Sequence, residues 1–387
     1  MMTIFFVLFF ISFLVIFYSY VGYPLLIYLL SKFFSKPENY TEIFPHVTIL
    51  IPAYNEEKYI AKKLDNTLAL DYPRDKMQIL VAADGSSDTT PDIVKSYANK
   101  GVQLNYIPER NGKMAAIVRA IQFCQGEILV FSDANNMYDF QALRKLLLPF
   151  SDSTVGASTG AKHIIEDGRE LSSAEGLYWK YESLIKKSES KINSCVSSVG
   201  EILAMRRDAF VAPKEKIIND DHYIILDLMR RGYRVIYIPE AHSFEYVSLT
   251  AQDEVERRTR MNAGLYQTIS MSKQLLPFQS PLLVWQVISH KYFRAIVPFA
   301  FILLFLSNVL ICVFYDSGGA LLLQVFLYLQ ILFYFLAGLG NFIQFSGVLR
   351  KMFYLPVFLV NSNLATLRGF YKFIANQQLH VWNRVGR

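Results

Sequence analysis

The chain has 387 residues, of which 52% are hydrophobic, 15% aromatic and only 19% charged. Soluble globular chains average about 45–50% apolar and about 25% charged residues, so this composition argues against a purely soluble protein. The net charge of +6 suits a protein that lies beside anionic lipid or handles phosphates. No Lys/Arg tract or nucleic-acid motif accompanies that charge, so we expect no nucleic-acid partner.

Apolar residues are concentrated at both ends of the chain. Residues 3–30 carry no charge, and about 20 helical residues are enough to cross a bilayer. Lys32 and Lys36 follow directly, and basic residues mark the cytoplasmic side of a membrane segment. A basic start and a small-residue cleavage site, which a signal peptide would need, are missing. We therefore expect a transmembrane helix over residues 1–31, with its end in the cytoplasm.

A second membrane region is expected over residues 276–387. Residues 280–293 mix apolar and polar side chains, as an interfacial helix does. Two spans are expected to follow, over residues 295–315 and 319–339. The link between them carries Asp316 and no basic residue, which places it outside.

The last apolar segment, residues 353–374, is interrupted by polar side chains. A full span is favoured, because polar residues buried among membrane helices are usually paired or functional. It would place Arg384 and Arg387 outside, against the charge rule. A re-entrant or interfacial hairpin avoids this conflict, and both alternatives remain open.

The central part, residues 46–275, has the composition of a soluble domain. β-rich runs alternate with amphipathic segments, and the runs are apolar on both faces. This pattern predicts an α/β fold with a parallel sheet covered by helices on each side. The predicted strands are residues 47–54, 77–86, 102–109 and 127–135. Ligands bind at the carboxyl ends of the strands in such sheets, so the residues there are the candidate site.

Three predicted strands end in polar clusters. The clusters are Pro52-Ala53-Tyr54-Asn55-Glu56, Asp84-Gly85-Ser86 and Asp133-Ala134-Asn135. An Asp-Gly-Ser run alone is usually a turn, and an acid at a strand end often caps a helix. Three such clusters at one edge of one sheet favour a binding site instead.

The residue types in these clusters suit a nucleotide-activated sugar. An aromatic ring and acids can hold a base and a ribose, and Mg²⁺ or Mn²⁺ bridges carboxylates to substrate phosphates. Lys113 follows Gly112 at the start of a predicted helix and can reach those phosphates. Neither a Walker pattern nor a GxGxxG run after a strand occurs, which disfavours phosphoryl and hydride transfer.

Two later motifs add candidates. Asp220 and Asp221 precede an amphipathic segment; they are either helix caps or an acid pair in which one carboxylate acts as a general base. Arginines at 257, 258 and 260 lie just before the membrane region. They would stabilise charge on a leaving diphosphate, or bind lipid head groups.

Taken together, these motifs resemble the membrane-integrated family 2 glycosyltransferases, the branch of the cellulose, hyaluronan and poly-N-acetylglucosamine synthases. The resemblance covers residues 47–267 in consistent order, with one span before the domain and several after. It implies a GT-A domain, a mixed and mainly parallel sheet between helices, inserted between transmembrane helices. It also implies that Tyr54, Glu56 and Asp84 hold base and ribose, with help from Lys113.

The same resemblance assigns the metal, the base and the diphosphate contacts. Asp133 and Asn135 stand at the place of the family's DxD motif and would bind Mg²⁺ or Mn²⁺. Asp221 stands where the family has its TED base. Arg257 and Arg260 belong to the stretch that matches QxxRW and would contact the donor.

Departures from the family pattern concern three positions. Asn135 replaces an aspartate, which weakens metal binding, and Arg257 replaces a glutamine. Met261 replaces the tryptophan beneath the acceptor sugar in processive synthases, which weakens the case for polymer synthesis. Gly200-Glu201 stands where the family contacts the acceptor, and Trp179 and Tyr181 either line that region or belong to the core.

The expected function is metal-assisted, inverting transfer of a hexose from a UDP-sugar to a glycan or lipid-linked acceptor in polysaccharide biosynthesis. The catalytic domain is expected on the cytoplasmic side of the plasma or inner membrane, beside lipid and a possible export or co-synthesis subunit. One alternative is transfer of a single sugar to polyprenyl phosphate. Another, from a different class, is a non-catalytic membrane scaffold that keeps a degenerate domain.

Overall fold

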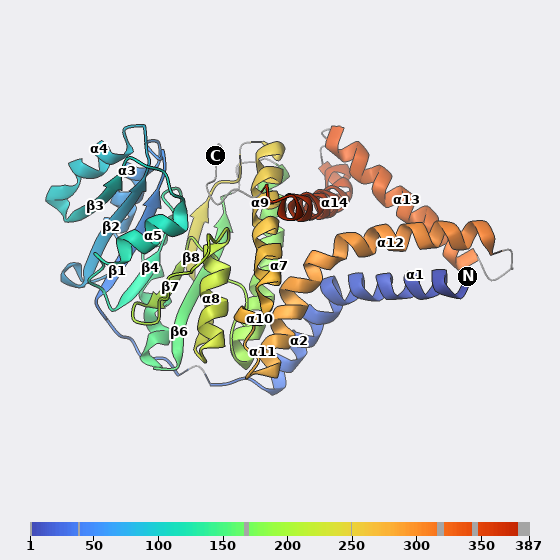
Figure 1. Cartoon of the computed structure of the whole chain (residues 1–387), viewed down its shortest axis with the longest axis horizontal. Helices are drawn as coiled ribbons and strands as arrows, with labels where there is room; N and C mark the ends of the chain where they lie inside the picture. Colours follow the sequence, from blue (N-terminus) through green and yellow to red (C-terminus); the bar gives the residue numbers. More distant parts are fainter. Residues whose placement is uncertain are drawn as a thin grey trace.

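The computed structural model describes residues 2–37, 39–165, 170–248, 250–315, 321–342 and 347–377. A sheet with its covering helices forms one end of the molecule, and long apolar helices form the other (Figure 1). Asp316, Arg384 and Arg387, which enter the expected membrane topology, lie outside the described residues.

The sheet has eight strands in the order β3-β2-β1-β4-β7-β6-β8-β5. β1 pairs in parallel with β2 and β4, β2 with β3, and β6 with β8. β7 pairs antiparallel with β4 and β6, and β5 pairs antiparallel with β8. The expected mixed, mainly parallel sheet is confirmed, and all four strands expected near its start are present. The strands are β1 Val47–Ala53, β2 Met77–Asp84, β3 Val102–Ile107, β4 Ile128–Phe131, β5 Met137–Tyr138, β6 Val155–Ile164, β7 Leu203–Arg206 and β8 Arg234–Glu245.

Helices cover both faces of this sheet, as its apolar strands require. Alternate side chains of a strand point to opposite faces; Ile49 and Ile51 of β1 pack with one set of helices and Leu50 with the other. The first face carries α3 (Ile60–Leu68), α4 (Thr90–Ser96) and α6 (Ala142–Leu147). The second carries α5 (Lys113–Ile121), α8 (Asp220–Arg230), α10 (Ser272–Leu275) and α11 (Pro281–Val287). Short 3₁₀ turns are η2 Arg74–Lys76, η3 Ala98–Lys100 and η4 Leu148–Ser151.

Two long helices, α7 (Glu170–Ile192) and α9 (Ala251–Ser270), stand between the sheet and the apolar helices (Figure 1). α14 (Gly347–Ile374) packs along α9. Gly369 allows this close approach, because a Cβ there would lie 2.7 Å from Cβ of Asn262 and 2.9 Å from the carbonyl oxygen of Thr259.

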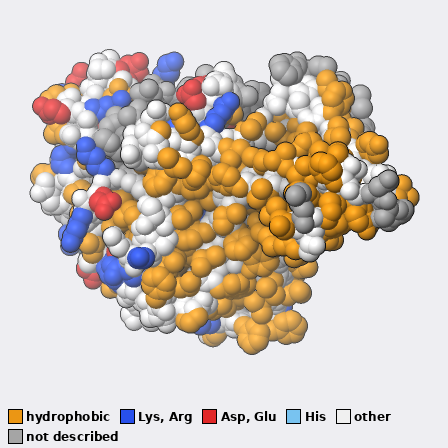
Figure 2. Space-filling model, turned by 45° about the vertical axis from the view of Figure 1, so that its right-hand side comes forward, with side chains coloured by type: hydrophobic (Ala, Val, Ile, Leu, Met, Phe, Trp, Pro, Cys, Tyr) orange, Lys and Arg blue, Asp and Glu red, His pale blue; other side chains and the backbone are white. Residues whose placement is uncertain are grey.

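Three helical segments among the described residues are long and apolar enough to cross a membrane. The first joins α1 (Met2–Phe17), a π-helical turn η1 (Tyr18–Gly22) and α2 (Tyr23–Phe33). The second joins α11, a π-helical turn η5 (Ile288–Tyr292) and α12 (Phe293–Phe314), so the expected interfacial helix is continuous with the span after it. The third is α13 (Leu321–Phe342). Hydrophobic side chains dominate the surface over this end of the molecule (Figure 2).

α14 contains the apolar segment for which a full span was favoured. It is not among the three segments. Figure 1 views it nearly end-on, whereas α1 and α12 run side by side across the view, so α14 lies across their direction. Two of the polar residues that interrupt it have partners: Asn363 donates to the hydroxyl of Tyr20 at 3.2 Å, and Asn361 donates to Asn341 of α13 at 2.9 Å. The span and the interfacial helix both stay predictions.

Candidate active site

An aromatic pocket lies where β1 and β2 end. Its lining residues are Pro52, Ala53, Tyr54, Asp84, Arg110, Gly112, Lys113 and Ala116. The guanidinium carbon of Arg110 lies 3.6 Å from the centre of the Tyr54 ring. The space left is only about 10 Å³, so the guanidinium occupies the ring face on which a base would stack. Sequence reasoning missed Arg110; its only signal is its position just before Asn111-Gly112-Lys113.

Asp84 ends β2 and fixes the loop that leads into α5. Its Oδ2 accepts hydrogen bonds from the backbone N–H groups of Asn111 at 2.9 Å and Gly112 at 2.7 Å, and its Oδ1 pairs with Arg119 at 3.2 Å. Gly112 has a φ of 95°, which residues other than glycine rarely adopt, so glycine suits this turn. Asp84 therefore lines the pocket and also fixes the start of α5, where Lys113 is the first residue.

Lys113 brings together acids from two distant parts of the chain. Its Nζ lies 2.9 Å from Oδ1 of Asp133, after β4, and 3.3 Å from Oδ2 of Asp220, at the start of α8. Burial lowers the pKa of Lys113, but Asp133 and Asp220 outweigh it, so the net pKa is raised and the ammonium stays charged. One cation thus stands between two carboxylates at the carboxyl edge of the sheet.

Asp221 is the neighbour of this group. Its Oδ2 accepts a hydrogen bond from Ser198 at 3.2 Å. A Cβ added to Gly200 would lie 3.2 Å from the Cβ of Asp221. Burial, and then the charge of Asp220, raise the pKa of the Asp221 carboxyl. A carboxylate with a raised pKa holds a proton more readily, as a general base must.

The arginines of α9 divide into two groups. Burial lowers the pKa of Arg260, and the charges of Asp220, Asp133 and Asp221 act on it in the opposite direction. Arg257 donates to Glu254 on its own helix at 2.7 and 3.0 Å. Of the two predicted donor contacts, Arg260 thus feels the charge of the acids, and Arg257 is paired on its own helix.

Asn135 and Glu56 are also held by protein groups. The Asn135 amide donates to Oε1 of Glu245 on β8 at 2.8 Å, a partner 110 positions away. The backbone N–H of Glu56 donates to Thr90 Oγ1 at 2.8 Å, and its carbonyl oxygen accepts from Tyr59 and Ile60 at the start of α3. Glu56 thus fixes the loop after β1 that carries Tyr54.

The two aromatic residues considered for the acceptor region have structural partners. The Trp179 indole N–H donates to Glu175 at 3.2 Å, and the ammonium groups of Lys162 and Lys186 lie over its ring at 5.5 and 5.2 Å. The Tyr181 hydroxyl donates to the carbonyl oxygen of Tyr20 at 2.9 Å. Trp179 is thus partnered within the domain, and Tyr181 joins α7 to the first apolar helix.

Comparison with known proteins relates this edge of the sheet to a family. Residues 48–211 match the family described as glycosyl transferase family 2. This segment has the sequence pattern of a family 2 glycosyl transferase domain. Every acid at the strand ends up to Asp133 lies within the matched residues.

Two curated relatives share part of the chain. The probable glycosyltransferase YdaM of Bacillus subtilis is 26% identical over 249 residues, which cover 59% of this chain and 56% of that protein. A poly-beta-1,6-N-acetyl-D-glucosamine synthase of Staphylococcus aureus is 27% identical over 243 residues, covering 61% of this chain and 58% of the synthase. The chain therefore matches little more than half the length of either relative.

A solved structure supports the fold over most of the chain. A mannosyltransferase from Pyrobaculum calidifontis, in complex with GDP-Man and Mn²⁺, aligns with a TM-score of 0.67 at 23% identity. The alignment covers 93% of this chain and 99% of that one. The family 2 domain has the expected GT-A fold, a curled and mainly parallel sheet between helices.

The residues of this domain fit a divalent ion whose coordination shell is completed by the substrate. Among the described residues, no three His, Cys, Asp or Glu side chains form a preformed metal cage. Mg²⁺ and related ions usually take one or two carboxylates and fill their remaining positions with phosphate oxygens and water. Lys113 forms ion pairs with both Asp133 and Asp220, so positive charge is favoured between these two carboxylates.

Substitution of Asp84 by Asn tests whether this carboxylate holds the loop. The loss of charge weakens its pairing with Arg119 and with two N–H donors, so hydrogen exchange of residues 110–113 should become at least 10-fold faster. Asn105→Ala is the matched control, because Asn105 also binds Arg119, at 2.7 Å, but does not touch the loop. Equal exchange in wild type and Asp84→Asn would show that the loop does not depend on Asp84.

Proposed function

We propose that this protein transfers a hexose from a UDP-sugar to a hydroxyl group of a glycan or lipid-linked acceptor, with inversion and with Mg²⁺ or Mn²⁺. The observation that carries this proposal is the group of Asp133, Asp220 and Asp221 around Lys113, beside the Tyr54 pocket. It offers an aromatic wall for a base, cations for a diphosphate and a carboxylate for a proton.

In this proposal Asp133, with the amide oxygen of Asn135, would hold the divalent ion. When bound, that ion would supply positive charge against the donor diphosphate. Lys113 and Arg260 face the same region and bind the charge that develops on the leaving UDP. Arg110 leaves the Tyr54 ring when the base enters, and can then cover its other face.

Asp221 is the proposed general base. The acceptor oxygen bonds to the anomeric carbon, the bond from that carbon to the diphosphate oxygen breaks, and Asp221 takes the hydroxyl proton. A single displacement from the opposite side inverts the anomeric centre. The choice of UDP rests on the likeness to the synthase branch, since the pocket residues do not discriminate between bases.

The domain is proposed to work on the cytoplasmic face of the membrane. Lys32 in the last turn of the first apolar segment and Lys36 just after it lie toward the domain, in line with the positive-inside rule. α7, α9 and α14 lie between the sheet and the apolar helices (Figure 1), so an acceptor at the membrane surface is close to the domain. Membrane lipid is thus a proposed partner.

Asp221→Asn should lower kcat by about 10²–10⁴-fold while the dissociation constant of UDP stays within about 3-fold, because that is the usual contribution of general-base catalysis and the amide cannot take a proton. Turnover of a panel of UDP- and GDP-sugars by purified protein with Mn²⁺ is the measurement. Asp208→Asn, at an exposed acid after β7, is the control. Near-normal turnover in Asp221→Asn would rule out this base.

The pH profile of kcat/KM tests the cause of the raised pKa of Asp221. The base form exists only above that pKa, so activity falls as the pH drops through it, above the value of about 3.9 for an ordinary aspartate. Asp220→Asn removes the neighbouring charge, which should lower the Asp221 pKa and move the acidic limb to lower pH. A limb that stays in place or moves to higher pH would contradict this account.

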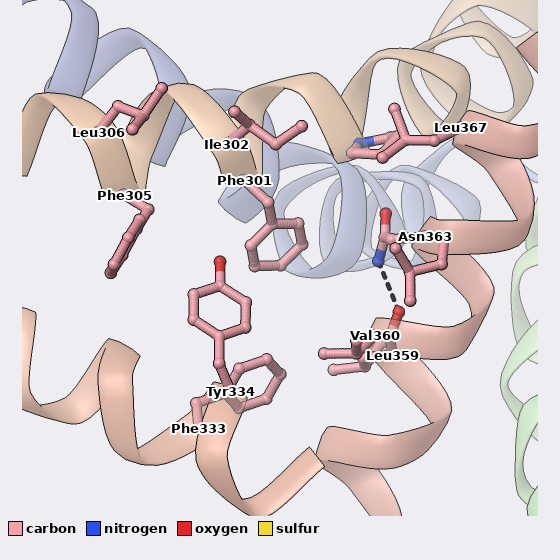
Figure 3. Close-up of a pocket in the computed structure, with 12 residues that line it drawn as sticks. Phe301, Ile302, Phe305, Leu306, Phe333, Tyr334, Leu359, Val360, Asn363 and Leu367 are labelled. Atoms are coloured by element: carbon pink, nitrogen blue, oxygen red, sulfur yellow. Dashed lines mark hydrogen bonds between the residues drawn. The ribbon is translucent and has the colours of Figure 1, made fainter. Parts of the chain in front are cut away.

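A second candidate, transfer of a single sugar to polyprenyl phosphate, is favoured by an apolar cavity. It encloses about 200 Å³ between α12, α13 and α14 (Figure 3). The lining residues are Pro298, Phe301, Ile302, Phe305, Leu306, Phe333, Tyr334, Leu359, Val360, Asn363, Leu364 and Leu367. Apolar cavities stay dry and accept hydrocarbon. α14, which lines the cavity, also contacts α9, where Arg258 donates to Ser362 at 2.9 Å.

Val360→Trp would fill this cavity. If it holds the hydrocarbon chain of the acceptor, the variant should lower transfer to polyprenyl phosphate at least 10-fold and leave UDP binding unchanged. Leu355→Trp, at an exposed position of the same helix, is the control. A ladder of long products on a gel, or full transfer in Val360→Trp, would instead favour polymer synthesis.

A further inference from the structure

Lys63 of α3 is a lysine in the core of the domain. Its side chain is fully buried, and its helix neighbours Ile60 and Leu64 pack in the apolar core. Among the residues that the structure describes, no carboxylate lies within ion-pairing distance of its Nζ. A buried amine without such a partner is costly, so a lysine at this core-facing position calls for a specific role.

The amine binds one residue of the loop after β4. Its Nζ donates to the backbone carbonyl oxygen of Asn136 at 2.9 Å and approaches the Asn136 side-chain oxygen at 3.4 Å. It also lies 4.2 Å from the centre of the Tyr138 ring. Asn136 directly follows Asp133-Ala134-Asn135, so Lys63 contacts the end of the loop that is predicted to bind the metal.

Asn136 ties this loop to the rest of the sheet. It is fully buried, and its amide donates to the carbonyl oxygen of Glu201 at 3.0 Å and to Ser243 at 2.7 Å. The Tyr138 hydroxyl also donates to the Glu201 carbonyl, at 2.8 Å. The loop end is thus joined to Glu201, just before β7, and to β8. On the α3 side Lys63 holds Asn136, while Asn66 exchanges hydrogen bonds with the backbone of Tyr138 at 3.0 and 2.9 Å.

We infer that Lys63 is a positioning residue, which fixes the Asp133–Asn136 loop so that Asp133 and Asn135 are presented to the cation and the donor diphosphate. This inference rests on the proposed function. Lys63 touches neither the cation position nor the substrate and acts through Asn136. Burial lowers the pKa of Lys63 to about 7, but a neutral amine still donates hydrogen bonds, so the contact does not depend on charge.

Lys63→Met tests this role, because methionine fills the space without a hydrogen-bond donor. Without metal, hydrogen exchange of residues 132–138 should become at least 10-fold faster. The Mn²⁺ concentration for half-maximal Mn²⁺ binding in the presence of UDP should rise at least 10-fold. This binding is followed by the electron paramagnetic resonance signal of Mn²⁺. Lys62→Met, at the exposed neighbouring lysine, should match wild type in both measurements.

Lys63→Gln adds a rescue, since its amide can donate to the Asn136 carbonyl, and it should bind Mn²⁺ more tightly than Lys63→Met. If Lys63→Met does not fold, Lys63→Gln against Lys62→Met decides the question. Unchanged exchange and unchanged Mn²⁺ binding in the Lys63 variants would overturn the inference. A wild-type protein that binds no Mn²⁺ with UDP would refute the proposed function instead, which the wild-type control reveals by itself.

Discussion

The placement of one cation among three carboxylates is the constraint on which the site depends. Asp133 follows β4 and the adjacent Asp220 and Asp221 begin α8, and these acids would repel one another at the sheet edge without Lys113, which pairs with Asp133 and Asp220. Lys113 is there because it is the first residue of α5, and α5 begins there because Asp84 binds the N–H groups of the two preceding residues, Asn111 and Gly112. The end of β2 therefore determines the electrostatics of the acids after β4 and before α8.

The catalytic domain and the apolar helices are joined by buried polar contacts. Arg258 of α9 pairs with Glu175 of α7 and donates to Ser362 of α14, so one side chain connects three helices. α11 begins a helix that is long and apolar enough to cross a membrane, and it also packs on the second face of the sheet. Since Arg260 lies two positions beyond Arg258, the helix that contacts α14 also carries a cation toward the acids.

The sequence predicted the sheet and the acids at its edge, because parallel strands bring their carboxyl ends together whatever their spacing in the chain. It did not predict the partners that a side chain finds across the fold. Asn135 turns its amide toward Glu245 on β8, and Arg257 pairs with Glu254, although each matched a family motif. Arg110 and Lys63 belong to no motif, and their roles appear only once the Tyr54 ring and Asn136 are placed beside them. The orientation of α14 depends on packing against α9, which apolar content does not encode.

The most direct test of the central claim is an experimental structure of the protein with UDP and Mn²⁺, in which anomalous scattering locates the ion. The account predicts a single Mn²⁺ bound by Asp133 and the diphosphate, the uracil beside Tyr54, and Asp221 facing the position of the sugar. A nucleotide bound away from this edge, or Asp84, Asp133 and Asp221 lining different cavities, would contradict it.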